Sequence, residues 1–155
     1  LNKDGSVDVE RCSQLVNMAR QHGLASTFHR AFDMCADQEK ALEDIIGAGF
    51  ERILTSGGKS FAIEGAAVIK NLVKKANGRI AIMAGGGINE SNVANLVHYT
   101  GVTEIHSSAR SIVKSDMLYQ NDHIIVGANH FNDEYTTDVT DTERVRQILA
   151  IANGN

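Results

Sequence analysis

The segment STFHRAFDMC places an imidazole, a guanidinium, a carboxylate and a thiol within a few residues of one another. Histidine titrates near neutral pH and a nearby carboxylate can fix its tautomer, so such a group can perform general acid–base chemistry. We predict that His29, Arg30 and Asp33 belong to a catalytic group. Side chains alternate between the faces of a strand, which directs His29 to the same side as Glu104 and His106 in the later segment TEIHSSA. The alternative is an interior polar network in which Arg30 and Asp33 form a structural ion pair.

Three consecutive glycines in MAGGGINESN lie between an apolar segment and a helical pattern. Glycine lets the backbone approach a ligand closely, and the free N–H groups at the start of a helix favour an anion. We therefore predict an anion-binding loop, completed by hydroxyl donors and a forked cation from the segment after the next strand. The predicted members are Gly85, Gly86, Gly87, Ser107, Ser108 and Arg110. The alternative is that the glycines only form a tight turn and pack the helix against the sheet.

Met34 and Cys35 form a pair of soft side chains directly after the first predicted strand. A thioether together with a thiolate is a ligand set that suits Cu(I), so we predict these two residues as candidate copper ligands. Cys12 lies on the apolar stripe of a predicted helix, where a free cysteine usually behaves as a small buried hydrophobe. The two cysteines of the chain have neither the number of a disulfide framework nor the spacing of a zinc site.

Helical and strand patterns alternate along the chain, which is typical of an α/β protein with a parallel sheet. Helical spacing of apolar residues covers 7–23, 37–49, 61–76 and 89–100, with Asp8 and Asp37 as N-caps. Strand patterns cover 25–32, 51–56, 79–84 and 103–109. Ligands of parallel α/β proteins bind at the carboxyl ends of the strands, and the polar residues named above fall there. The second strand adds Thr55, Ser56, Gly57 and Gly58 to that set.

The pattern weakens after Arg110, and we predict a long loop region through Asp138 with a short β-like segment at 123–129. A final helix follows, in which Thr140 and Glu143 have the spacing of a capping box. The first helix has no strand before it, although parallel strands are joined by covering crossovers. We therefore expect a strand upstream of this sequence; the alternative is a complete small open sheet of the flavodoxin type.

The composition fits a single domain over residues 1–155, with 43% hydrophobic residues and a formal net charge of −4. Lysines and arginines are scattered, which argues against a nucleic-acid or anionic membrane surface and favours a small-molecule partner. The sequence contains neither an apolar run of membrane-spanning length nor the order of a signal peptide, so we expect a cytoplasmic protein.

Five motifs, TFHRAFDMC, RILTSGG, AIEGAAVIKNLV, GRIAIMAGGGI and EIHSSAR, resemble in order and spacing those of the copper homeostasis protein CutC family. The resemblance covers essentially the whole chain. It implies a TIM-type (βα)8 barrel, of which this chain would supply the last four strands and the C-terminal helix. It also implies copper binding in the cytosol, although the cysteines usually discussed as copper ligands belong to the first strands and carry over onto neither Cys12 nor Cys35. The chain lacks the proline that many relatives have before STFH and in MAGGG, which affects turn stiffness more than chemistry.

Three functions remain open. The first is a copper homeostasis protein that binds Cu(I). The second is a barrel enzyme acting on a small phosphorylated or carboxylated metabolite, with the glycines and Arg110 holding the anion and His29 or His106 moving protons. The third is an interaction protein whose polar residues are incidental. Because half a barrel would have two unpaired edges and an exposed apolar interior, we also expect a homo-oligomer.

Overall fold

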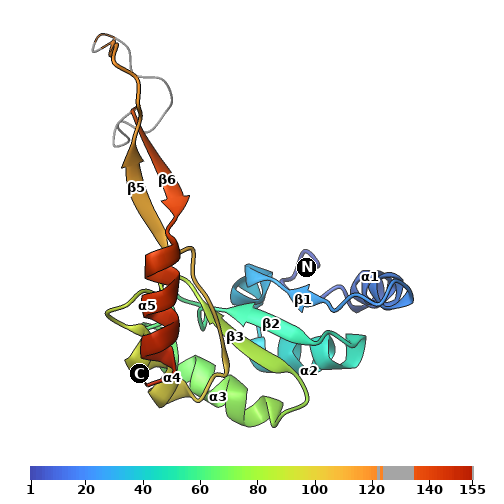
Figure 1. Cartoon of the computed structure of the whole chain (residues 1–155). Coiled ribbons are helices and arrows are strands. Elements are labelled where there is room, and N and C mark those ends of the chain that lie inside the picture. The colour runs from blue at the N-terminus through green and yellow to red at the C-terminus, as the bar shows by residue number, and fades with distance from the viewer. Residues whose placement is uncertain (122, 124–134, 155) are drawn as a thin grey trace.

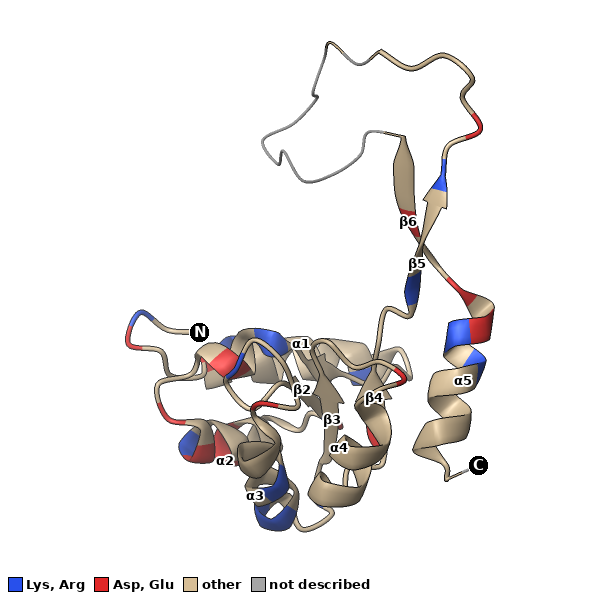
Figure 2. Ribbon diagram, turned by 90° about the vertical axis from the view of Figure 1, so that its left-hand side faces the viewer, with Lys and Arg blue, Asp and Glu red and all other residues tan. Residues whose placement is uncertain are grey.

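The structure is a computed structural model that describes residues 1–121, 123 and 135–154. Its main sheet contains four parallel strands in the order β1-β2-β3-β4 (β1 to β3 are labelled in Figure 1, and β2 to β4 in Figure 2). The strands are β1 (Thr27–Phe28), β2 (Arg52–Thr55), β3 (Ala81–Gly85) and β4 (Glu104–His106). The predicted α/β fold with a parallel sheet is confirmed. The strand predicted over 25–32 is wrong beyond residue 28, because a 3-10 helix, η1 (Arg30–Met34), follows β1 almost at once.

Five α-helices accompany the strands in the described part of the chain. They are α1 (Val9–Gln21), α2 (Gln38–Ala48), α3 (Ala66–Ala76), α4 (Val93–Thr100) and α5 (Thr142–Ala152). The predicted caps Asp8 and Asp37 accept hydrogen bonds from backbone N–H groups of the first turns of α1 and α2. The capping box predicted for the last helix is wrong by one residue, because Asp141 caps α5 and Thr140 ends a strand.

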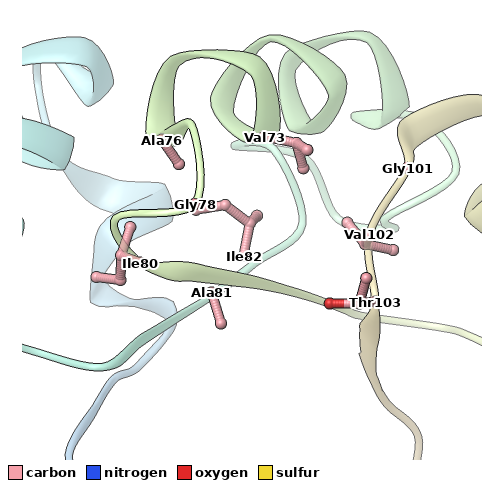
Figure 3. Close-up of a pocket in the computed structure, with 9 residues that line it drawn as sticks. All are labelled: Val73, Ala76, Gly78, Ile80, Ala81, Ile82, Gly101, Val102 and Thr103. Atoms are coloured by element: carbon pink, nitrogen blue, oxygen red, sulfur yellow. The ribbon is translucent and has the colours of Figure 1, made fainter.

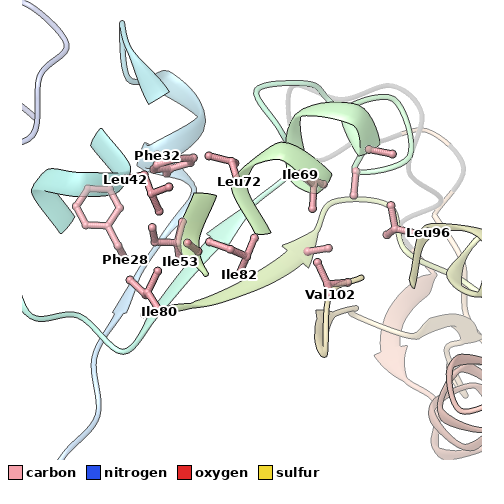
Figure 4. Close-up of a cluster of buried hydrophobic side chains, with 14 of the residues drawn as sticks. Phe28, Phe32, Leu42, Ile53, Ile69, Leu72, Ile80, Ile82, Leu96 and Val102 are labelled. Atoms are coloured by element: carbon pink, nitrogen blue, oxygen red, sulfur yellow. The ribbon is translucent and has the colours of Figure 1, made fainter. Parts of the chain in front are cut away.

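The apolar core lies between one face of the sheet and the helices (Figure 4). Strand residues Phe28, Ile53 and Ile82 are buried there. They pack in one cluster with helix residues such as Leu42 and Leu72. Full burial of an Ile or Leu side chain contributes about 1.5–3 kcal/mol, so this cluster holds the helices on the sheet.

The opposite face of the sheet, called the open face here, has a different composition. It carries Arg52, Leu54, Ala81, Met83 and Glu104, all partly exposed. Burial alternates along β2 and β3, with the open-face residues the more exposed members. The sheet therefore presents one apolar face to helices and one mixed face of intermediate exposure.

An antiparallel arm projects from the rest of the molecule (Figures 1 and 2). It consists of β5 (Arg110–Lys114) and β6 (Thr136–Thr140), paired so that Ile112 lies opposite Asp138. The long loop predicted after Arg110 is therefore wrong at both of its ends. The β-like segment predicted at 123–129 lies, apart from His123, outside the described residues. None of the helices that the structure describes has the length and apolar character to span a membrane.

Candidate functional site

The carboxyl ends of the strands and the loops that follow them form one edge of the sheet, called the rim here. At the rim, the carboxylate of Asp33 accepts hydrogen bonds from five donor groups, one of which, Ser56 N, is shared by both oxygens. Its Oδ1 accepts from Thr55 Oγ1 at 2.5 Å, Gly58 N at 3.0 Å and Ser56 N at 3.1 Å. Its Oδ2 accepts from Arg30 Nε at 2.8 Å and Ser56 Oγ at 3.0 Å. The Asp33 cluster, defined as Arg30, Asp33, Thr55, Ser56 and Gly58, thus ties the end of β1 to the loop after β2.

The Asp33 side chain is only 6% exposed. Burial raises its pKa, but hydrogen bonds from Thr55, Arg30 and the backbone of Gly58 and Ser56 outweigh burial, so the pKa lies below its usual value. The group is therefore a carboxylate at neutral pH, and its oxygens are occupied by protein donors. This arrangement suits an anchor for the loop after β2.

Arg30 follows β1, bonds to the loop after β2 and lies beside the loop after β3. Besides its bond to Asp33, its Nη2 donates to Ser56 Oγ at 2.6 Å and to the carbonyl of Lys59 at 3.0 Å. Its Nη1 faces the third loop, since a Cβ atom added to Gly86 would lie 3.5 Å from Nη1. The ion pair that the sequence analysis gave as the alternative for Arg30 and Asp33 is present, and it belongs to this wider network.

The glycine loop, Gly85–Gly87, is tightly packed. A Cβ atom on Gly85 would come within 2.6 Å of Leu54 Cδ1, and one on Gly87 within 2.5 Å of Phe61 Cδ1. Gly86 has a φ of +115°, which L side chains rarely adopt, and its carbonyl accepts from Ala62 N at 2.9 Å. Close approach to neighbouring side chains and backbone explains the three glycines, and an anion-binding role for them stays a prediction.

The other members of the predicted anion site are placed differently from one another. Ser107 Oγ donates to the carbonyl of Ile88 at 2.7 Å, so Ser107 joins the glycine loop. Ser108 is exposed. Arg110 is exposed and begins the arm, where its carbonyl accepts from Arg144. Ser107 is therefore beside the loop, while Arg110 belongs to the base of the arm.

The predicted acid–base residues are spread across the sheet. His29 is exposed, and its Nδ1 accepts from Ala31 N at 2.9 Å, which caps η1. His106 ends β4, at the other edge of the sheet from β1, so three strand spacings, about 14 Å along the sheet, separate the two strands. Both oxygens of Glu104 bond to Arg52, with Nη2 to Oε1 at 2.9 Å. The structure thus gives His29 and Glu104 separate partners.

Glu104 and Arg52 form their ion pair across the open face. Arg52 lies opposite Ala81 and Glu104 opposite Met83, so the pair reaches over β3 beside the small Ala81 side chain. The hydrogen bond from Arg52 lowers the pKa of Glu104, although burial opposes this shift. This carboxylate is also ionised at neutral pH.

The soft residues lie at the end of η1, where Met34 is its last residue and Cys35 follows it. Met34 is 75% exposed, and Cys35 is half-buried with Sγ 3.7 Å from the carbonyl of Ala31. Burial raises the pKa of the Cys35 thiol, and of the Cys12 thiol on α1 as well. Among the residues that the structure describes, no three His, Cys, Asp or Glu side chains are grouped to hold a metal ion.

A separate pocket of about 320 Å³ opens near the amino ends of β3 and β4 (Figure 3). Its lining includes Val73, Ala76, Ile80 and Val102. None of the lining residues is charged, and they lie at the opposite end of the strands from the rim. The sequence did not predict this pocket, because its walls consist mostly of ordinary apolar residues from α3, β3 and the loops before β3 and β4.

Thr55 and Ser56 are rim residues that the sequence placed at a strand end without assigning them a partner. The signal that could have joined them to Asp33 is the parallel register, in which Phe28 lies opposite Ile53. Two neighbouring parallel strands that end at the same level bring their following residues together.

The comparisons with known proteins agree on one family. The model of the CutC family matches residues 1–111. The chain is 46% identical over 152 residues to a mouse protein named copper homeostasis protein cutC homolog, which covers 98% of this chain and 55% of the mouse protein. It is also 46% identical over 145 residues to a family protein CutC of Bacteroides thetaiotaomicron, covering 94% of this chain and 57% of that protein.

A solved structure supports the same assignment. The crystal structure of a CutC protein from Streptococcus agalactiae matches with a TM-score of 0.63 and 37% sequence identity, over 68% of this chain and 51% of that one. The chain spans about half the length of the curated relatives that it matches. The resemblance found in the five sequence motifs is confirmed, and the chain belongs to the CutC family.

Proposed function

We propose that the protein acts in copper homeostasis in the cytosol and binds Cu(I). The observation that carries this proposal is the 46% identity, over nearly the whole chain, to a protein named for copper homeostasis. Met34 and Cys35 are the soft side chains that we assign to the metal. They are adjacent in sequence at the end of η1, with the thioether exposed and the thiol half-buried.

The chemistry of Cys35 suits a metal that displaces a proton. Burial keeps the free thiol protonated at neutral pH, so Cu(I) binding as the thiolate releases a proton. Affinity should therefore rise with pH. Exposed Met34 can turn its sulfur toward the same ion, because its side chain is unbranched and flexible.

Cu(I) titration against a chromophoric chelator tests this assignment. We expect Cys35→Ser to weaken binding by about tenfold or more, because it removes the thiolate, and Met34→Leu to weaken it less. Cys12→Ser is the matched control, since Cys12 is also half-buried with a raised thiol pKa. Equal affinity of Cys35→Ser and Cys12→Ser would remove Cys35 as a ligand, and absence of Cu(I) binding by the wild type would refute the copper proposal.

We further propose that residues 1–155 form one domain within a closed TIM-type (βα)8 barrel, completed in a homo-oligomer or by further strands. Two features support this proposal. In the described part of the chain β1 and β4 each have one neighbour in the sheet, and the open face leaves Leu54 and Met83 partly exposed. All-parallel sheets are normally covered on both faces. Sedimentation should show an oligomer, and a compact, cooperatively folding monomer would contradict that part of the proposal.

A second candidate function is that of a barrel enzyme for a small phosphorylated or carboxylated metabolite. The rim favours it, because polar side chains from the ends of β1 and β2 and the glycine loop after β3 meet there. In this proposal Gly85, Gly86, Gly87, Ser107, Ser108 and Arg110 hold the anion, and His29 or His106 moves a proton. Binding of inorganic phosphate or of a small dicarboxylate by the wild-type protein is its first requirement.

A further inference from the structure

The guanidinium of Arg30 is fixed in place on two of its three nitrogens. Nε donates to Asp33, and Nη2 donates to Ser56 and to the carbonyl of Lys59. In the part of the chain that the structure describes, Nη1 donates no hydrogen bond. The Arg30 side chain as a whole is 43% exposed. Four other donors hold Asp33, and Asp33 holds Arg30. The Arg30 side chain is therefore already ordered, and a ligand that binds it loses little further conformational entropy.

The space beside Nη1 depends on Gly86. A Cβ atom at position 86 would lie 3.5 Å from Nη1 and 3.2 Å from the carbonyl oxygen of Ser60. Any larger side chain would therefore occupy the approach to the guanidinium. Gly86 therefore places no side-chain atom between its loop and Nη1.

Two cations, Arg30 and Lys59, belong to this part of the rim. Asp33 balances the charge of Arg30. Lys59, whose backbone carbonyl accepts from Arg30, is exposed and forms no ion pair among the described residues. Glu90, the acidic residue nearest in sequence to the glycine loop, is paired with Arg144. Glu64, in the same loop as Lys59, accepts from Phe61 N, so the two cations and the two acids Asp33 and Glu64 balance in number. The attraction for an anion therefore depends on the unused donor Nη1 of Arg30.

We propose that Arg30, rather than Arg110, is the arginine that binds the oxyanion of a small ligand at the rim, with Nη1 as donor beside Gly86 and Lys59 as the neighbouring charge. The ligand class is a small molecule carrying a phosphate or a carboxylate group. This inference rests on the second proposed function and reassigns its cation. Arg110 lies at the base of the arm, whereas Arg30 lies between the loops after β2 and β3.

The test measures binding of inorganic phosphate and of succinate to the full chain by isothermal titration calorimetry, which separates the two ligand classes. We expect Arg30→Gln to weaken binding of the preferred probe by about tenfold or more, and Lys59→Gln by less, because a charge-assisted hydrogen bond contributes more than a nearby exposed charge. Arg110→Gln tests the arginine that the second proposed function assigned to the anion, and it should bind as the wild type does if Arg30 is the ligand instead. Binding that survives Arg30→Gln and is lost in Arg110→Gln would overturn the inference while leaving the second function standing.

A measurement on the wild type avoids dependence on the folding of Arg30→Gln. Phenylglyoxal modifies accessible arginines, and mass spectrometry of the digested protein reports the extent at each position. Saturating phosphate or succinate should protect Arg30 and leave Arg110 as reactive as before. Equal modification of Arg30 with and without bound anion would refute the assignment, and failure of the wild type to bind either probe would refute the second function together with it.

Discussion

Two carboxylates of the sheet, Asp33 at the rim and Glu104 on the open face, are both held by an arginine, but their surroundings differ. Asp33 accepts from Arg30 and from four further donors at the end of β2 and in the loop after it. The described bonds of Glu104 all come from one side chain, Arg52. Asp33 is 6% exposed and Glu104 is 32% exposed.

The comparison shows what makes a carboxylate structurally indispensable. Removing a buried acceptor leaves each of its donors without a partner, and each such loss costs about 1–3 kcal/mol in a buried site. When a half-exposed ion pair is broken, water solvates both partners, so the net contribution of the pair to the free energy of unfolding is small. The rim should therefore depend on Asp33 far more than the open face depends on Glu104.

The largest expected effect is that of Asp33→Ala. We expect it to lower the free energy of unfolding by about 3–5 kcal/mol, because the buried Thr55 hydroxyl and the buried Ser56 N–H lose their acceptor. Urea denaturation of the variant measures this loss. Asp44→Ala, which removes an exposed i,i+4 ion pair to Lys40, is the control and should change stability little. A loss at Asp33 as small as that at Asp44 would contradict the comparison.

Two glycine substitutions, one at the rim and one in a helix, should change the free energy of unfolding by an intermediate amount. A Cβ atom on Gly65 would overlap the carbonyl oxygen of Ser56 and approach Gly57 Cα to 2.9 Å. Gly65→Ala should therefore destabilise the protein by about 1–3 kcal/mol or more, through overpacking against backbone. Gly47→Ala is matched to it, because Gly47 lies inside α2 with open space around it, and this change should stabilise by about 0.5–1 kcal/mol. The midpoint temperature of thermal unfolding should fall for Gly65→Ala and rise for Gly47→Ala. A rise for both variants would show that the loop after β2 can move to accommodate the added Cβ atom.

The sheet and the meeting of its strand ends could be predicted from the sequence for a physical reason. β2 and β3 carry alternating apolar residues that bury one face, as at Ile53 and Ile82, and this pattern is local. Parallel order then follows from the helices between the strands, and Asp33 and Ser56 meet because Phe28 and Ile53 are in register. The strand ends were less predictable. β1 gives way to η1 at His29, whose side chain accepts a hydrogen bond from Ala31 N, and the alternation of apolar residues does not reveal such a side-chain to backbone bond.

The arm and the partner of Glu104 could not be predicted, because both depend on residues far apart in the sequence. β5 pairs Ser111 with Val139, and neither five-residue strand carries a long alternating pattern. Glu104 meets Arg52 across β3, which requires knowing that Ala81 lies between them. Local patterns specify elements, whereas contacts of this kind are set by tertiary register.

The smallest expected effect is that of Glu104→Gln, which tests the open-face side of the comparison. It should lower the free energy of unfolding at pH 7 by about 1 kcal/mol or less, since the pair is partly exposed. The pKa of Glu104 is lowered in the folded protein, so its contribution is fully present above the unfolded value of about 4.3 and is lost as the pH falls through the lower folded value. The stability difference between wild type and Glu104→Gln should therefore vanish in acid.

The same difference should also shrink in 1 M NaCl, about the concentration at which the screening length falls to 3 Å. The loss of stability in Asp33→Ala should persist in that salt, because the Asp33 site is buried. Urea titrations at two pH values and two salt concentrations measure both dependences, with Arg52→Gln closing a double-mutant cycle. A coupling energy that salt leaves unchanged would mean that the open face is covered by protein in solution, and Glu104 would then behave as Asp33 does.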